Sequence, residues 1–382
     1  MSAIATPVKE VEDRYVFVDA LRGIAAVAVV VCHLFYSRWL FKSTEIGTFH
    51  LFADIALYGA RGVQIFFVIS GFVIAHSLRR TIPDARGIGN FILRRQVRLD
   101  LPYWAVMAGI LLLAVIEQRM PFIRHPGTLP APGDLLLNMT YLQIILGRTP
   151  ILGVAWTLCI EIQFYLFFML TLAVTTRRAM AGRIATATLA AVFVTGVAFL
   201  AFDPAPSEVK PWMVHYWPYF AAGALAYWSV RRWIPLWVFP VFCVPFAVSW
   251  FWSAVPSATI TGVATAVVLY AVGLRGKLTS LWKGRGLQYL GRTSYSLYLV
   301  HVPVVFLVCQ IGFQLTHDTR ASAALWYTVA GSASLLVADL FHRCIEQPSM
   351  RLASRFKRRP AGRDSSVAMV PQEILPASGS VQ

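Results

Sequence analysis

Long apolar runs, separated by short polar stretches, dominate the sequence. Ten of the runs are 17 to 28 residues long, and an α-helix needs about 20 apolar residues to cross a bilayer. We therefore expect an all-α integral membrane protein with about ten transmembrane helices. The expected spans are residues 17–39, 57–78, 101–117, 151–174, 184–202, 212–230, 234–252, 256–274, 288–315 and 323–345.

The basic residues between these runs are unevenly distributed. With the N-terminus placed in the cytoplasm, 24 of the 34 Lys and Arg residues fall on the cytoplasmic side of the predicted helices and eight on the outer side. This bias is the positive-inside pattern of membrane proteins. It predicts that both termini are cytoplasmic. It also explains the net charge of +16 by membrane topology, so we expect membrane lipids and no nucleic acid as partners.

The composition agrees with a membrane protein. Only 14% of the residues are charged, against about 25% in soluble proteins. We divide the chain into a cytoplasmic N-terminal tail (1–14), a transmembrane domain (15–350) and a cytoplasmic tail that is first basic and then disordered (351–382). The five cysteines fall in apolar runs without a CxxC pair, which predicts packing and neither disulfides nor a metal site.

The first predicted helix contains two ionisable residues, Arg22 and His33, eleven positions apart. Eleven residues make about three helical turns, so both side chains share one face and lie about 16 Å apart along the axis. A buried ionisable group in a bilayer is costly and is by default a functional candidate. We therefore treat His33 as a candidate catalytic residue and Arg22 as a candidate cofactor-binding residue.

The second predicted helix carries Arg61 at its outer end and Gln64 one turn further in. These side chains share a face and could line a polar cavity open to the outside, so both are candidate substrate-binding residues. Ser70 and Gly71 are small residues in the middle of the same helix. Small residues allow helices to pack closely, and we favour that role for them.

Arg95 and Arg98 lie three positions apart in the most basic segment, just before Pro102. Arginines in a cytoplasmic segment are expected from topology alone. Two guanidinium groups on one helix face also form a fork that suits phosphate groups. Coenzyme A is a cytosolic ligand with several phosphates, so these arginines are candidate cofactor-binding residues.

Three polar positions in later helices complete the candidates. Glu161 lies about ten residues into the fourth predicted helix, near mid-bilayer depth. A carboxylate there must be protonated, paired or in contact with water, and we favour a catalytic role over a structural hydrogen bond. Tyr298 and His301 lie about one turn apart in the ninth helix, with His301 at a depth similar to His33. His301 is either a structural imidazole or a second catalytic histidine, and Tyr298 is a candidate substrate-binding residue.

The last predicted helix holds two pairs of ionisable residues four positions apart, Asp339 with Arg343 and His342 with Glu346. Residues at this spacing are neighbours on a helix surface and can satisfy each other. We therefore predict two local pairs.

Five motifs in order resemble the acyltransferase-3 family of integral membrane O-acyltransferases over about residues 15–350. A departure is Asp19-Ala20-Leu21, where a glycine often precedes the leucine. No soluble hydrolase-like domain follows in this sequence, so we expect the membrane unit to act alone or to pass its product to another protein. The motifs are R-x10-H from Arg22, R-x-x-R from Arg95, W-T-L-x-x-E-x-x-F-Y-L from Trp156, G-x-x-S-Y-S-L-Y-L-x-H-x-P from Gly291 and E-x-P from Glu346.

The resemblance implies transfer of an acyl group from acyl-CoA, most commonly acetyl-CoA, to a hydroxyl of a carbohydrate or lipid-linked saccharide of the cell envelope. It implies a bacterial inner membrane and no metal, and it adds Trp156 as a candidate substrate-binding residue. A desolvated, neutral His33 could act as general base on the acceptor hydroxyl or as nucleophile. Glu161 or His301 could orient His33 or protonate the leaving group.

Two other classes of function remain open at this point. Buried Arg, His and Glu residues also suit a proton-coupled exporter of a saccharide or small molecule, although no inverted repeat is detectable. A non-catalytic scaffold in envelope assembly is the third alternative. Dependence on acyl-CoA separates the enzyme from both.

Overall fold

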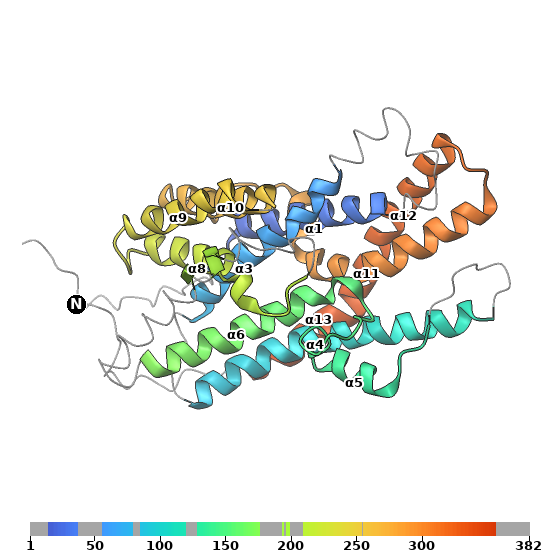
Figure 1. Cartoon of the computed structure of the whole chain (residues 1–382), viewed down its shortest axis with the longest axis horizontal. Helices are drawn as coiled ribbons and strands as arrows, with labels where there is room; N and C mark the ends of the chain where they lie inside the picture. Colours follow the sequence, from blue (N-terminus) through green and yellow to red (C-terminus); the bar gives the residue numbers. More distant parts are fainter. Residues whose placement is uncertain are drawn as a thin grey trace, which may run out of the picture.

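The structure is a computed structural model that describes residues 14–36, 56–78, 85–119, 128–175, 193–194, 196–198, 209–253 and 255–356. All regular structure in these residues is helical (Figure 1). The α-helices are α1 (Val16–Tyr36), α3 (Gly62–Leu78), α4 (Ala85–Glu117), α5 (Pro132–Met139), α6 (Trp156–Thr175), α8 (Trp217–Val230), α9 (Val238–Val248), α10 (Pro256–Leu274), α11 (Arg285–Leu315), α12 (Arg320–Phe341) and α13 (Gln347–Ser354). Short 3₁₀ turns are η3 (Tyr58–Arg61), η4 (Gly153–Ala155), η5 (Met213–His215) and η6 (Ser249–Phe251), and a π-helical turn, η7 (His342–Glu346), joins α12 to α13.

Seven helical segments of the described residues are long and apolar enough to cross a membrane, so the prediction of an all-α membrane protein is confirmed. The helices in the predicted spans 212–230 and 234–252 are shorter, with α8 at 14 and α9 at 11 residues. The predicted span 184–202 falls mostly outside the described residues. The seven segments are Val16–Tyr36, Tyr58–Ser77, Gly87–Glu117, Gly153–Thr171, Pro256–Leu274, Arg285–Leu315 and Arg320–Ser354.

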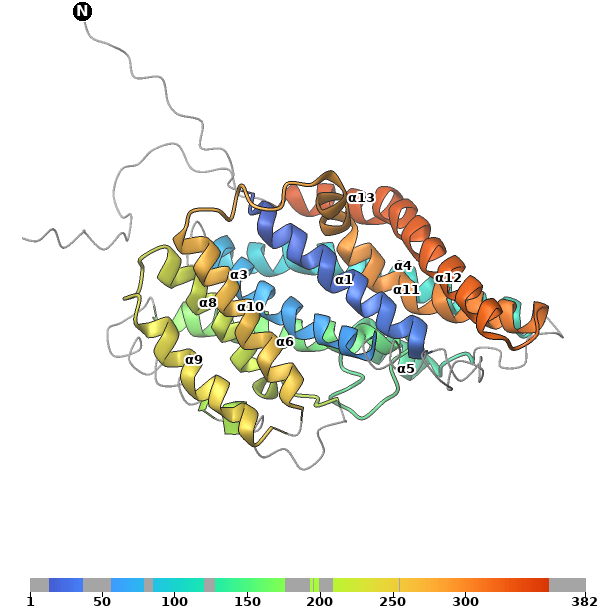
Figure 2. The same ribbon diagram turned by 90° about the horizontal axis from the view of Figure 1, so that it is seen from above.

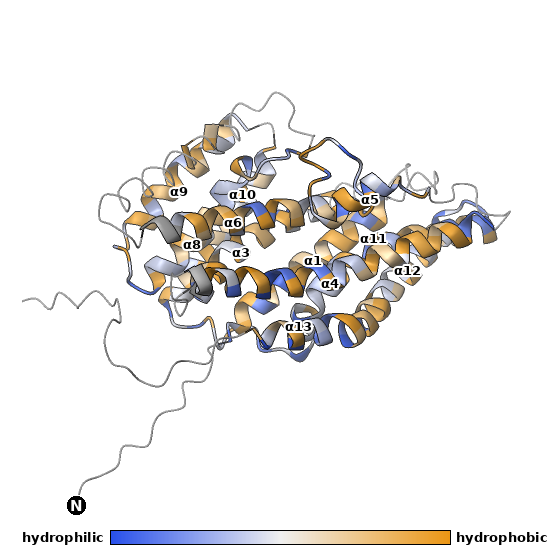
Figure 3. Cartoon of the chain, turned by 90° about the horizontal axis from the view of Figure 1, so that it is seen from below, coloured by the Kyte–Doolittle hydropathy of each residue, from blue (hydrophilic) through white to orange (hydrophobic). Residues whose placement is uncertain are grey.

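Hydrophobic positions predominate along most of these helices (Figure 3), and many large aliphatic side chains are exposed. Leu336 and Leu340 of α12 are 69% and 62% exposed, and Val241 and Val244 of α9 are 59% and 60% exposed. Large aliphatic side chains exposed in such numbers suit hydrocarbon and not water. The apolar runs in the sequence therefore supply both the lipid-facing surface and the interior of the bundle.

The helix α4 begins earlier than the apolar pattern predicts. It spans 33 residues from Ala85 and continues through Pro102, whereas the predicted span begins at residue 101. Leu99 and Tyr103, on either side of the proline, are 6% and 0% exposed, so burial of this stretch offsets the backbone hydrogen bond that proline removes. As a result Arg95 and Arg98 lie on a helix inside the bundle.

The closest helix pair for the site is α1 and α11, which lie side by side in Figures 1 and 2. They meet at two glycines. A Cβ atom on Gly291 would lie 2.2 Å from the Asp19 carbonyl oxygen, and one on Gly23 would lie 2.8 Å from the Gly291 nitrogen. Only glycine allows the backbones to approach so closely. His33 and His301 each follow one of these glycines by ten residues.

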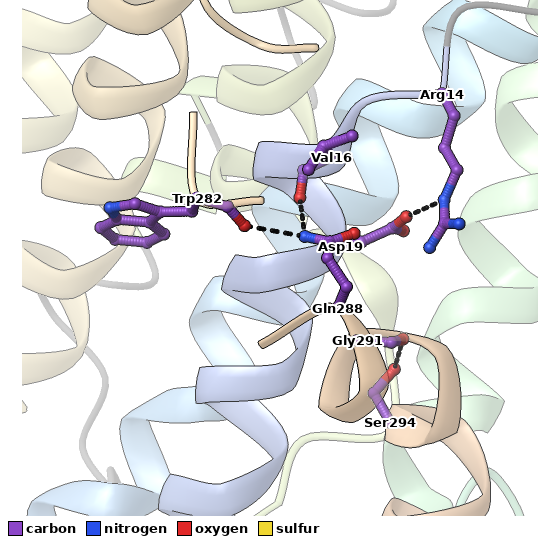
Figure 4. A network of polar contacts seen from close by, with 7 residues as sticks. All are labelled: Arg14, Val16, Asp19, Trp282, Gln288, Gly291 and Ser294. Atoms are coloured by element: carbon purple, nitrogen blue, oxygen red, sulfur yellow. Dashed lines mark hydrogen bonds and ion pairs between the residues drawn. The ribbon is translucent and has the colours of Figure 1, made fainter. Parts of the chain in front are cut away.

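Polar contacts at the start of α1 fix how the two helices pair (Figure 4). Gln288 Nε2 donates to the Val16 carbonyl oxygen at 2.8 Å and to the Trp282 carbonyl oxygen at 3.0 Å. Arg14 Nε donates to Asp19 Oδ2 at 2.6 Å within the α1 segment. The backbone N–H of Phe17, which a helix start leaves unpaired, donates to the Leu278 carbonyl oxygen at 3.0 Å. Together with the Gln288 bonds, this contact ties the start of α1 to the segment around the start of α11.

A second glycine contact joins α3 to α8. A Cβ atom on Gly71 would lie 1.9 Å from the Phe220 carbonyl oxygen, and one on Gly223 would lie 1.9 Å from the Val68 carbonyl oxygen. The predicted packing role of Gly71 is therefore confirmed.

Both ends of the described bundle lie on the same side. The start of α1 and the short α13 appear together at one end in Figure 2. Ser349 of α13 donates to the Val97 carbonyl oxygen of α4 at 2.7 Å, which ties α13 to the helix that carries Arg95 and Arg98.

Candidate active site

A cavity lies between α1, α3, α4, α6 and α11. Its lining combines three arginines and one carboxylate with a wall of aliphatic and aromatic side chains. A mixed lining of this kind is typical of a ligand site. The polar lining residues are Arg22, Ser70, Arg95, Arg98, Thr157, Glu161, Tyr165, Ser294, Tyr295 and Tyr298, and the apolar ones are Val63, Phe66, Phe67, Ile69, Val73, Leu99 and Leu158.

The three candidate cofactor-binding arginines all line this cavity. Arg22 comes from α1, and the charges of Arg22 and Arg95 act electrostatically on Arg98. Arg95 donates to the Tyr165 hydroxyl and to Ser77 Oγ, both at 3.4 Å. Within the described part of the chain, Arg22 and Arg98 line the cavity without a hydrogen bond or ion pair. Like charges so arranged are unfavourable until an anion joins them.

Glu161 lies in the same cavity and is held from a second helix. Glu161 Oε1 accepts hydrogen bonds from Ser70 Oγ of α3 at 3.0 Å and from the Tyr165 hydroxyl of α6. Tyr165 in turn accepts from Arg95, so the carboxylate is linked through one hydroxyl to a guanidinium. This arrangement satisfies a carboxylate in an apolar layer. Ser70, predicted to serve packing, is a polar partner of Glu161.

His33 and His301 contact each other across α1 and α11. His301 Nε2 lies 3.3 Å from His33 Nδ1, and the ring centroids are 4.8 Å apart. His33 Nδ1 also contacts the Val29 carbonyl oxygen at 2.8 Å, and His301 Nδ1 contacts the Leu297 carbonyl oxygen at 3.0 Å. A carbonyl oxygen only accepts, so the contacts assign the proton of each neutral ring to Nδ1. His33 then carries its basic lone pair on Nε2.

Tyr298 connects the cavity to the histidine pair. Its ring lies 5.9 Å from the His301 ring and 5.6 Å from the Phe66 ring, measured between centroids. The Tyr298 hydroxyl is 2.9 Å from Thr157 Oγ1 and 3.2 Å from the Val154 carbonyl oxygen. Neither histidine is among the lining residues. Because His301 follows Tyr298 by three residues, the pair lies about one helical turn beyond the end of the cavity.

The other three candidates lie elsewhere. Arg61 and Gln64 do not line the cavity, and Arg61 acts electrostatically on Cys32 and Tyr219. Arg61 Nε and Gln64 Oε1 are buried without a hydrogen-bond partner. Trp156 packs against the rings of Phe67 and Tyr216, with centroid distances of 6.1 and 5.5 Å. Phe67 lines the cavity, and Trp156 lies behind it. Their assignment to substrate binding stays a prediction.

Two polar features of the site were not identified from the sequence. Tyr165, which bridges Arg95 and Glu161, follows Glu161 by four residues in a motif quoted above, and that spacing was the available signal. Glu346 Oε2 accepts from Ser296 Oγ of α11 at 2.6 Å as well as contacting His342 Nδ1 at 2.8 Å. Its charge also acts on Arg98. No local sequence pattern indicates that Glu346 contacts Ser296 of α11.

The two predicted local pairs of the last helix are present. His342 Nδ1 lies 2.8 Å from Glu346 Oε2, and Arg343 Nη2 lies 2.7 Å from Asp339 Oδ2. Among the residues that the structure describes, no group of three or more His, Cys, Asp or Glu side chains could hold a metal ion.

Comparison with known proteins identifies the family. The family model described as an acyltransferase domain (acyltransferase 3) matches residues 15–343. The chain is 30% identical to acyltransferase MdmB of Streptomyces mycarofaciens, over 89% of this chain and 92% of that protein. It is 26% identical to Nodulation protein 10 of Rhizobium leguminosarum bv. viciae, over 89% of this chain and 95% of that protein. No solved structure gives a significant match. The chain therefore belongs to the acyltransferase-3 family of membrane-embedded acyltransferases.

Proposed function

We propose that this acyltransferase moves a short acyl group, most simply acetyl, from acyl-CoA to a hydroxyl of a sugar or lipid-linked saccharide of the cell envelope. One observation supports the proposal most strongly. Arg22, Arg95 and Arg98 gather at one end of a cavity whose other end adjoins the pair His33 and His301. This arrangement supports a path that runs from the phosphates of a bound donor to a base.

The arginine end suits the phosphates of the donor. Arg22 and Arg98 face the cavity without partners in the described part of the chain, so binding a phosphate breaks no existing contact of theirs. Arginine binds phosphate oxygens with two parallel N–H donors. The positive-inside pattern predicts that this end faces the cytoplasm, where acyl-CoA is present.

The histidine end suits the transfer. As a general base, His33 Nε2 takes the proton of the acceptor hydroxyl while the oxygen of that hydroxyl attacks the thioester carbonyl carbon. The C–S bond then breaks, and the His33 imidazolium returns the proton to the coenzyme A thiolate. As a nucleophile, the same lone pair first takes the acyl group and then passes it to the hydroxyl. Both routes need Nδ1 to carry a proton, as its contact with Val29 requires.

Transfer of radioactive acetyl groups tests the proposal. Membranes that contain the wild type are supplied with labelled acetyl-CoA, and we expect label in the saccharide or glycolipid fraction as an ester that mild alkali releases. His33→Ala should abolish this label at equal protein level. Asp339→Asn, at a partly exposed pair away from the cavity, is the matched control and should retain it.

Saccharide export by the intact protein without any use of acyl-CoA would contradict the proposal and show a transporter.

The same experiment distinguishes the two routes. Label that is bound to the wild-type protein, is released by hydroxylamine and is absent in His33→Ala would select the nucleophilic route.

A further inference from the structure

The helix α3 lines the cavity, so the position of a residue along α3 gives its depth in the cavity. At one end of α3, Ser77 accepts from Arg95 at 3.4 Å. In the middle, Ser70 donates to Glu161 at 3.0 Å. Towards the other end, where Val63 also lines the cavity one turn further on, Phe66 packs edge-on against Tyr298, with centroids 5.6 Å apart. Eleven residues separate Phe66 from Ser77, which is about 16 Å along the helix.

The same axial distance separates Arg22 from His33 on α1, eleven residues or about 16 Å. An extended pantetheine arm is of comparable length. A donor whose phosphates lie among the arginines would therefore bring its thioester close to Phe66, Tyr298 and the histidine pair. The acyl chain, which continues beyond the thioester carbonyl, meets the wall at that end.

We propose that Phe66 limits the length of the acyl chain that the cavity accepts. The inference rests on the proposed function, because it requires acyl-CoA as the donor. It adds the residue that selects among acyl donors. Phe66 lines the cavity directly, and its ring is the aromatic contact between α3 and the Tyr298 ring beneath His301.

The contacts of Tyr298 explain why Phe66 sets the limit. The Tyr298 hydroxyl is fixed by Thr157 Oγ1 at 2.9 Å and the Val154 carbonyl oxygen at 3.2 Å. Moving that ring away from a longer chain would leave a buried hydroxyl unpaired. Phe66 has only apolar contacts to lose, so its size determines the space at this end of the cavity.

Val73 provides the matched control. It lines the same cavity from the same helix, seven residues from Phe66 and about 10 Å nearer to the arginine end. A chain that ends near Phe66 does not reach Val73. Shortening Val73 should therefore leave the preference among acyl chains unchanged, although it also enlarges the cavity.

Competition for labelled acetyl-CoA on the purified protein tests the inference without an acceptor. Unlabelled acetyl-, butyryl- and hexanoyl-CoA are compared for wild type, Phe66→Ala, Phe66→Trp and Val73→Ala. Phe66→Ala should raise the affinity for hexanoyl-CoA relative to acetyl-CoA by about tenfold, the lower range for apolar size discrimination. Phe66→Trp should lower that ratio, and Val73→Ala should keep the wild-type ratio. If Phe66→Ala does not fold, Phe66→Leu takes its place.

Each remaining outcome decides against one claim. Equal ratios for wild type, the shortened Phe66 variant and Phe66→Trp would overturn the role of Phe66, as would an equal change in Val73→Ala. A folded wild type that binds none of these acyl-CoA molecules would instead overturn the proposed function.

Discussion

The position of one proton decides what the histidine pair can do. His33 Nδ1 lies between the Val29 carbonyl oxygen at 2.8 Å and His301 Nε2 at 3.3 Å. His301 is 0% exposed and is held by its own helix through the Leu297 carbonyl oxygen. Its unprotonated Nε2 can share the His33 Nδ1 proton with the Val29 carbonyl oxygen without moving. We infer that His301 positions His33, whose Nε2 acts on the substrate.

His301→Ala should lower kcat for transfer by about tenfold or more, because the His33 ring loses one of the two acceptors that hold its orientation and keeps only the Val29 carbonyl oxygen. The KM for acyl-CoA should stay the same, since His301 does not line the cavity. His301→Gln, whose side-chain oxygen can still accept from Nδ1, should recover part of the loss. Steady-state kinetics in membranes measure both constants. A wild-type kcat in His301→Ala would refute a positioning role.

Arg98→Ala should weaken acyl-CoA binding by at least about tenfold, because a guanidinium that faces the cavity without a protein partner is lost to the ligand. Arg98→Lys keeps the charge and loses the fork, so it should fall between alanine and wild type. Equilibrium binding of labelled acetyl-CoA reports the difference. Equal affinity for all three proteins would exclude Arg98 from the donor site.

At the scale of helices, the site depends on how closely α1 approaches α11. Sequence periodicity correctly predicted that Arg22 and His33 share a face, because that follows from one helix alone. It also predicted Arg95 and Arg98 on a common face. It did not predict that Ser70 donates to Glu161, because periodicity does not determine which helix a face contacts.

Gly291→Ala tests the α1 and α11 contact. The new Cβ would lie 2.2 Å from the Asp19 carbonyl oxygen, so the helices must separate, at a cost of about 1–3 kcal/mol in the free energy of unfolding. We expect a lower thermal transition and reduced transfer. Gly286→Ala, on the same helix with nothing within 4 Å of the added Cβ, should leave both unchanged. Equal behaviour of the two variants would contradict close packing as the reason for glycine.

At the scale of the whole molecule, one family unit of residues 15–343 encloses a cavity whose ends differ in chemistry. The apolar runs predicted the membrane bundle because lipid demands satisfied backbones and apolar faces. The length of α4 was not predicted, because its basic first half is helical and its proline lies inside the helix. The start of α1 and α13 lie on the same side of the bundle, and the cytoplasmic location of the termini stays a prediction.

A reporter active only in the cytoplasm, fused after the last residue, should be active, and an alkaline phosphatase fused at the same place should be inactive. The expectation follows from the positive-inside pattern. A reporter in the polar segment between α4 and α5 should behave in the opposite way. The reverse result at both sites would place the arginine end of the cavity outside and remove acyl-CoA as its ligand.

The central claim is that donor binding and acyl transfer are separated along one path, with arginines at one end of the cavity and His33 about one helical turn beyond its other end. The most direct test measures binding of labelled acetyl-CoA and transfer of its label in the same membranes. We predict that His33→Ala binds the donor as the wild type does and transfers no label, while the double variant Arg22→Ala with Arg98→Ala loses binding. Transfer that survives in His33→Ala, or full binding in the double variant, would contradict the account.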